Sequence, residues 1–154
     1  MSQVEDRLHA IGLTVPAVVM PLAAYVPAMR SGMHVYTAGQ LPMVEGELAA
    51  VGRLGAEIST EEGAELAKIC ALNAIAAVKS VIGDLDRVVR VVKVVGFVAS
   101  TPEFTSHPAV VNGASNLLKE AFGEAGVHAR SAVGVAALPL GAPVEVEMIV
   151  EVAD

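Results

Sequence analysis

Arg130 is the clearest candidate for a functional residue in this sequence. It lies in the run HARSAVGVAALP, residues 128–139, and no Lys or Arg follows it. An arginine stays charged at any working pH, and its planar guanidinium fits a carboxylate with two parallel hydrogen bonds. Arg130 is therefore a candidate clamp for a small anion.

The carboxylates that follow Arg130 could complete such a site. If Leu140-Gly141 forms a tight turn, Arg130 pairs across a hairpin with Glu151, and Glu145 lies about six residues, or roughly 20 Å, further along the ladder. Arg130 and Glu145 then cannot meet within one chain, so a site that contains both is shared between two subunits. The alternative is a plain Arg130–Glu151 ion pair, with the acidic residues forming a solvated strand face.

Other reactive side chains do not form a recognisable site. Four histidines are scattered without metal-ligand spacing: His9, His34, His107 and His128. We expect no metal site. Ser131 points to the strand face opposite Arg130 and has no nucleophile-elbow context, which makes a serine hydrolase improbable. Cys70 falls inside a helical pattern and is interpreted as a small core residue.

Two helices are predicted behind these residues. Ser59 and Glu62 form a capping box, which indicates a helix from Ser59 to Ile82 that ends at Gly83-Asp84. A second helix follows His107-Pro108. A short amphipathic helix is expected over residues 4–11.

The predicted strands complete an order of ββ-α-β-α-ββ. Segments 23–30 and 33–41 flank a Ser31-Gly32 turn, and residues 43–58 suggest a loop with one edge strand. The Val-rich segment 87–100 predicts a central strand buried on both faces. Residues 130–138 place Arg130, Ala132, Gly134 and Ala136 on one roomy face, and residues 144–152 alternate between apolar and mostly acidic positions. This is an α+β sandwich, a mixed sheet with two helices on one side.

Composition limits the partners. The chain has 154 residues, of which 54% are hydrophobic and only 3% aromatic, and its mean hydropathy is +0.59. Arg90, Lys93 and Gly96 interrupt even the Val-rich segment, so no membrane span is expected, and the apolar surplus predicts a subunit interface. A net charge of −7 argues against nucleic acid as a partner. The N-terminal MSQVEDR lacks signal-peptide features and cysteine is nearly absent, so we expect a cytoplasmic protein.

Several segments together resemble one family. They are Tyr25, YTAGQLP (36–42), Val111-Asn112, ARSAVGVAALP (129–139) and VEVE (144–147). In combination they are similar to the Rid family of reactive intermediate deaminases, also called YjgF or endoribonuclease L-PSP. The resemblance covers about residues 25–152. It implies a chorismate-mutase-like fold and a homotrimer with three clefts between subunits. We divide the chain into an N-terminal extension, residues 1–20, and a single domain, residues 21–154.

The resemblance also assigns roles to residues. It implies that Arg130 holds a substrate carboxylate and that Glu145 positions or activates water. The cleft would be lined by Tyr25, Ala38, Gly39, Asn112 and Ala132. The family usually has Ser or Thr at the position of Ala38 and often Cys at that of Ala132. Both polar groups are missing here. The missing Cys bears on substrate preference, and the missing hydroxyl group at Ala38 removes a polar contact and widens the pocket.

The function implied is the hydrolysis of enamines and imines of 2-amino acids to 2-keto acids and ammonia, with no cofactor. The ligand is then a small carboxylate-bearing imine or keto acid. The alternative is a non-catalytic protein that binds small carboxylates in the same clefts for sensing or regulation. RNA cleavage, which one family name suggests, conflicts with the acidic net charge and ranks last.

Overall fold

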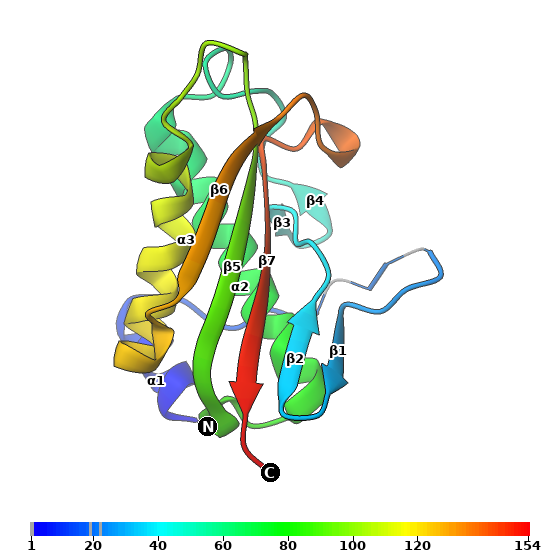
Figure 1. The fold of residues 1–154 in the computed structure, drawn as a ribbon, viewed down its shortest axis with the longest axis vertical. Coiled ribbons are helices and arrows are strands. Elements are labelled where there is room, and N and C mark those ends of the chain that lie inside the picture. Colours follow the sequence, from blue (N-terminus) through cyan, green and yellow to red (C-terminus); the bar gives the residue numbers. More distant parts are fainter. Residues whose placement is uncertain (1, 19, 22) are drawn as a thin grey trace.

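The computed structural model describes residues 2–18, 20–21 and 23–154 (Figure 1). The α-helices are α1 (Gln3–Ala10), α2 (Thr60–Ile82) and α3 (His107–Phe122), with short 3₁₀ turns at η1 (Leu85–Arg87), η2 (Gly123–Gly126) and η3 (Pro139–Gly141). The strands are β1 (Ala28–Ser31), β2 (His34–Thr37), β3 (Met43–Val44), β4 (Glu47–Leu48), β5 (Val88–Ala99), β6 (Ala129–Val135) and β7 (Val144–Val152).

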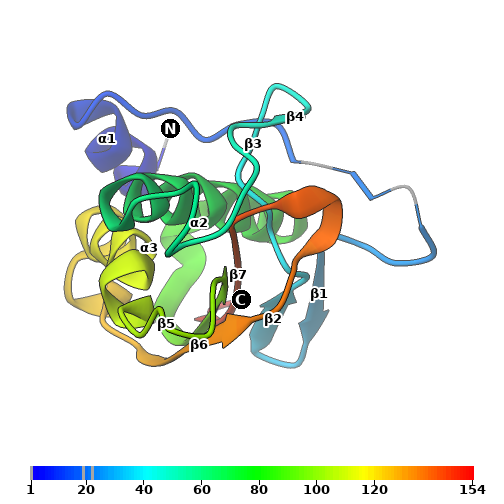
Figure 2. The ribbon, with the colours of Figure 1, turned by 90° about the horizontal axis from the view of Figure 1, so that it is seen from above.

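The main sheet has five strands in the order β1-β2-β7-β5-β6. Only β5 and β6 are parallel, and the other neighbours are antiparallel. Helices α2 and α3 lie side by side on one face of this sheet (Figure 2). The predicted mixed sheet with two helices on one side is therefore confirmed. The smaller β3–β4 hairpin is a separate sheet.

The predicted hairpin between the last two strands is wrong. Strand β5 lies between β6 and β7, so Arg130 is paired in register with Val94. Glu151 instead lies beside Arg90, whose Nε is 3.5 Å from a Glu151 carboxylate oxygen. The expected Arg130–Glu151 ion pair does not form. The physical reason is that the connection after β6 crosses the end of β5, so the chain returns as β7 on the other side of β5. Strand β6 is thereby left at the edge of the sheet and does not pair with β7.

Several strand predictions also need correction. Strand β5 lies inside the sheet, but it is not buried on both faces, because helices cover only one of them. On the covered face Val94 and Val98 are fully buried, whereas Lys93 and Val95 on the other face are only partly buried. Strands β1 and β2 are shorter than expected, and their turn is Gly32-Met33, with Gly32 at φ +61°. Residues 43–58 contain two short strands instead of one.

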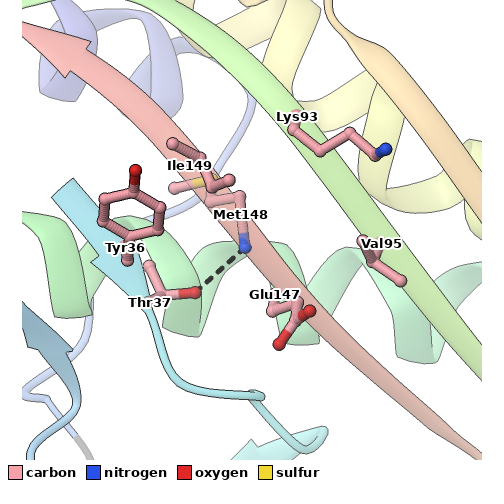
Figure 3. A pocket seen from close by; sticks show the side chains of 7 residues that line it. All are labelled: Tyr36, Thr37, Lys93, Val95, Glu147, Met148 and Ile149. Atoms are coloured by element: carbon pink, nitrogen blue, oxygen red, sulfur yellow. Dashed lines mark hydrogen bonds between the residues drawn. The ribbon is translucent and has the colours of Figure 1, made fainter. Parts of the chain in front are cut away.

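The face of the sheet without helices carries apolar and charged side chains together. Tyr36 (β2), Lys93 and Val95 (β5), and Glu147 and Ile149 (β7) surround a hollow of about 110 Å³ (Figure 3). Beside it, Thr37 Oγ1 accepts a hydrogen bond from the Met148 N–H at 3.0 Å. Tyr36 remains 45% exposed.

Within the described ranges, no helix is both long and apolar enough to cross a membrane.

Helix α1 ties the N-terminal extension to the helical layer. Ser2 and Glu5 form a capping box, and the side chains of Val4 and Leu8 are buried in the hydrophobic core. Asp86 accepts hydrogen bonds from the N–H groups of Gln3 and Val4. The hydrogen bond from Lys79 is the main reason that the pKa of Glu5 falls to about 2.

The predicted start and end of α2 are confirmed. Ser59 caps the helix by accepting a hydrogen bond from the Glu62 N–H at 3.1 Å, and Gly83 follows its last turn. Cys70 is fully buried, as expected. Small residues bring α2 and α3 into close contact, because a Cβ added at Gly113 of α3 would overlap the backbone carbonyl of Ala64 in α2.

This contact predicts that Gly113→Ala destabilises the protein. A Gly→Ala change inside a helix ordinarily stabilises by about 1 kcal/mol, but here the two helices must move apart. We expect a net loss of about 3 kcal/mol in the free energy of unfolding, measured by urea denaturation. Asn116→Ala, on the exposed side of α3, is the matched control and should change that free energy by less than about 0.5 kcal/mol. Equal stabilities of the two variants would contradict the close helix contact.

Candidate functional site

Arg130 projects from the edge strand β6 toward helix α3. One of its terminal nitrogens, Nη1, donates to Asn112 Oδ1 at 2.8 Å and to Ser115 Oγ at 3.2 Å. Asn112 and Ser115 are three residues apart on α3, so they share one helix face. The guanidinium therefore lies on the helix-covered side of the sheet, between α3 and β6. These two elements lie side by side in Figure 1.

The strand face that carries Arg130, which the sequence predicts to be roomy, is partly filled by neighbouring side chains. Ala132 lies next along this face and packs against the core. At Gly134 the space is filled, since a Cβ there would lie 2.5 Å from His107 Nε2 and 2.9 Å from Ser100 Oγ. His107 Nε2 and Ser100 Oγ are themselves 3.1 Å apart. The seam between α3 and β6 is thus closed beside Gly134, at the start of α3.

Glu145 lies on the opposite face of the sheet. It is paired in register with Phe97 of β5, and it alternates with Val144 and Val146, which are fully buried beneath the helices. Because successive side chains of a strand point to opposite faces, the Glu145 carboxylate is directed to the side without helices. Between Arg130 and Glu145 lie roughly 10 Å along the strands and roughly 10 Å across them.

The surroundings of Glu145 raise its pKa above the ordinary value of 4.5. Burial is the larger cause, because it disfavours the charged carboxylate, and the negative charge of Glu147 adds to it. Gly39 packs directly against this side chain: a Cβ at Gly39 would lie 2.7 Å from Glu145 Cδ. An alanine at position 39 would therefore displace the carboxylate.

Tyr25, Ala38 and Gly39 line a large groove of about 1070 Å³. Its other walls come from the extension, the β3–β4 hairpin and α2. Among the residues that form them are Leu13, Pro16, Val18, Met20, Met43, Val44, Ile69 and Leu72. Tyr25 is 59% exposed and so presents its ring to solvent or to a partner.

The expected site residues thus form two separate clusters in one chain. Arg130, Asn112 and Ala132 belong to the α3–β6 seam. Tyr25, Ala38 and Gly39 belong to the groove, and Glu145 lies against Gly39. Each cluster holds one of the two charged groups.

Sequence reasoning missed two residues of the Arg130 cluster, Ser115 and His128. His128 Nε2 is 2.9 Å from Ser115 Oγ, and His128 Nδ1 is 2.6 Å from the Gly126 carbonyl oxygen. The spacing could have indicated both residues, because Ser115 follows Asn112 by one helical turn and His128 precedes Arg130 by two strand positions.

Metal-binding clusters are not found in the part of the chain that the structure describes, where no three His, Cys, Asp or Glu side chains converge. Cys70 lies close to the Val144 carbonyl oxygen, with its Sγ at 3.7 Å. Burial raises the pKa of this thiol well above its usual value, so it is not a thiolate nucleophile.

Comparison with known proteins gives relatives along nearly the whole chain. Protein TCP17 of Trypanosoma cruzi is 45% identical over 150 residues, which cover 97% of this chain and 94% of the relative. The crystal structure of Atu1372 from Agrobacterium tumefaciens, a protein of unknown function, has a TM-score of 0.93 and 45% identity, and the match covers 98% of this chain and 93% of that one. A crystal structure from Shewanella oneidensis described as a "putative endoribonuclease" has a TM-score of 0.94 and 36% identity, covering 97% of this chain and 99% of that one.

A family model also matches residues 5–152, and its description reads "YjgF/chorismate_mutase-like, putative endoribonuclease". The resemblance inferred from the sequence motifs is thereby confirmed. Both the length of the family match and the identity to the relatives exceed what a shared fold alone would give. The chain belongs to the YjgF/chorismate mutase-like family.

Proposed function

We propose that this protein hydrolyses enamines and imines of 2-amino acids to 2-keto acids and ammonia, in clefts formed between the subunits of a homotrimer. The observation that carries the proposal is the separation of Arg130 and Glu145 onto opposite faces of one sheet. A cleft that uses both groups takes the arginine cluster from one subunit and the glutamate cluster from its neighbour. The partly apolar face without helices supplies a surface for that contact.

Arg130 is suited to bind the substrate carboxylate. Its Nη1 is held by Asn112 and Ser115, whereas Nε and Nη2 form no hydrogen bond with any described residue. These two donors lie on one edge of the guanidinium and match the two oxygens of a carboxylate. Binding at this edge fixes the position of the adjacent imine carbon.

Glu145 is suited to hold and activate water. The enamine first tautomerises to the imine by taking a proton at its β-carbon and releasing one from nitrogen. Water then adds to the imine carbon: the Glu145 carboxylate accepts one of its protons and passes it to the imine nitrogen, which gives a carbinolamine. The carboxylate next accepts the proton of the new hydroxyl group and passes it to nitrogen as the C–N bond breaks, so that the keto group forms and ammonia leaves. A raised pKa makes Glu145 a better base and acid near neutral pH than an ordinary surface glutamate.

The groove provides room for the side chain of the substrate. Tyr25, Ala38 and Gly39 border it, and Ala38 brings no hydroxyl group into it. An apolar lining of this size favours imines that carry an aliphatic or aromatic side chain. The residues that line the groove give no basic surface along which RNA could lie, in keeping with the net charge of −7.

We predict that Arg130→Ala strongly lowers catalysis with little effect on folding. The imine is generated by an amino-acid oxidase or dehydratase in the presence of semicarbazide, and keto-acid release is compared with that of wild type. Loss of a charged carboxylate contact should lower kcat/KM by about 100-fold or more. Arg30→Ala, which removes a surface ion pair with Asp154, is the control and should retain activity.

If the wild-type protein leaves the rate of imine decay unchanged, the deaminase proposal is wrong. Calorimetry with 2-ketobutyrate then tests the alternative, since binding without turnover favours a non-catalytic carboxylate-binding protein. If the wild-type protein cleaves a defined RNA and Arg130→Ala does not, the ribonuclease activity named in the family description is favoured instead.

We also predict that Glu147→Gln lowers the pKa of Glu145. Removing the neighbouring negative charge makes the Glu145 carboxylate easier to form, while the effect of burial stays, so the pKa falls only part of the way toward 4.5. A ¹³C NMR titration of the Glu145 carboxyl measures this change. If Glu145 acts as the base, the rising limb of the kcat profile moves to lower pH in the variant. An unchanged Glu145 titration would show that Glu147 does not influence it.

A further inference from the structure

A chain of hydrogen bonds runs from the backbone to the Arg130 guanidinium. His128 Nδ1 lies 2.6 Å from the Gly126 carbonyl oxygen, and His128 Nε2 lies 2.9 Å from Ser115 Oγ. Ser115 Oγ in turn accepts from Arg130 Nη1 at 3.2 Å. The chain links a loop, a strand and a helix, because these groups come from η2, the residue before β6, α3 and β6 itself.

The chemistry of the end groups fixes the direction of this chain. A carbonyl oxygen only accepts, so His128 Nδ1 carries the hydrogen that it donates to Gly126. In the neutral ring Nε2 is then the acceptor, and Ser115 donates its hydroxyl hydrogen to it. The lone pairs of Ser115 Oγ are thereby left for the hydrogen bond from Arg130.

These hydrogen bonds restrain the guanidinium of Arg130. Nη1 has two hydrogens, of which one is donated to Ser115 and the other to Asn112. Two acceptors on the same nitrogen fix the plane of the group and its rotation. The opposite edge, with Nε and Nη2, forms no hydrogen bond with the described part of the chain and points its two parallel donors away from α3.

We propose that Ser115 and His128 are positioning residues that hold Arg130 so that its Nε–Nη2 edge receives the carboxylate of the substrate. The identity of the anion rests on the proposed function, whereas the restraint on Arg130 follows from the hydrogen bonds alone. Neither residue belongs to the motifs that carry the family resemblance. Both act through Arg130 and touch no reacting atom.

Restraint of this kind favours binding because an ordered guanidinium loses less conformational freedom when the anion arrives. It also favours the reaction, because a tilted carboxylate would move the imine carbon away from the water held by Glu145. Removing the Ser115 hydroxyl breaks the link to His128 and leaves Nη1 with Asn112 alone. Affinity for a carboxylate should then fall more than affinity for a neutral ligand of the same shape.

The first experiment compares Ser115→Ala with Ser115→Thr, which keeps a hydroxyl. Calorimetry measures the Kd values of 2-ketobutyrate and of its amide, 2-ketobutyramide. For Ser115→Ala we expect the Kd of the carboxylate to rise about tenfold and that of the amide by less than about twofold. Ser115→Thr should restore the carboxylate Kd to within about threefold of wild type. A structural defect would weaken both ligands alike.

The second experiment needs no ligand. Side-chain ¹⁵N NMR of Arg130 in the intact protein reports rotation of the guanidinium about its C–N bonds. We expect separate Nη1 and Nη2 resonances in wild type, and their coalescence in Ser115→Ala. His128→Leu should also release the group, whereas His128→Gln keeps an acceptor near the Nε2 position and should retain the restraint. This pair gives the same test if Ser115→Ala does not fold.

The outcomes separate the two proposals. If Arg130 is restrained in wild type and released in the variants, but no carboxylate binds to wild type, the restraint stands and the proposed function fails. If Ser115→Ala leaves both the guanidinium resonances and the ratio of carboxylate to amide affinity unchanged, the positioning role is overturned, whatever the substrate.

Discussion

The constraint on which the whole arrangement depends is that the sheet is covered by helices on one face only. In a strand, neighbouring side chains point to opposite faces, so the covered face takes the valines of β7 and the other takes its glutamates. Arg130 is directed to the covered side, where α3 supplies its hydrogen-bond partners. Glu145 is directed to the other side. Two oppositely charged groups are thereby kept apart in one molecule.

Their separation has an electrostatic consequence. A carboxylate adjacent to Arg130 would form an ion pair and would have a lowered pKa, and the arginine would no longer be available for an anion. Instead, burial and Glu147 raise the pKa of Glu145, while the Nε–Nη2 edge of Arg130 has no partner among the described residues. Under the proposed function, a single subunit therefore holds its anion-binding group and its base in separate places. Assembly is the step that would join them.

The elements that could be predicted from the sequence are those encoded by local interactions. The capping box at Ser59 defines the start of α2, and the apolar–acidic alternation of residues 144–152 matches β7 from its first residue to its last. The family could be inferred because its motifs are short and contiguous in sequence. Each of these features depends on neighbours within a few positions.

The features that could not be predicted depend on contacts between distant segments. Eight residues connect β6 to β7, and nothing in that connection reveals that β5 lies between them. Sequential strands more often pair with each other, so the hairpin was the natural expectation. The link between Ser115 and His128 was missed for a related reason. It exists only because α3 lies along β6, and the spacing within each segment does not reveal that the two segments meet.

The central claim, that one cleft uses Arg130 of one subunit and Glu145 of another, is tested most directly by mixing two inactive proteins. Arg130→Ala and Glu145→Gln variants are unfolded together in equal amounts, refolded, and assayed for imine hydrolysis. With random assembly, about a quarter of the clefts receive an intact arginine from one subunit and an intact glutamate from its neighbour, so activity should return to about a quarter of wild type. If the mixture stays as inactive as either variant alone, although each variant refolds and exchanges subunits, the shared cleft is contradicted.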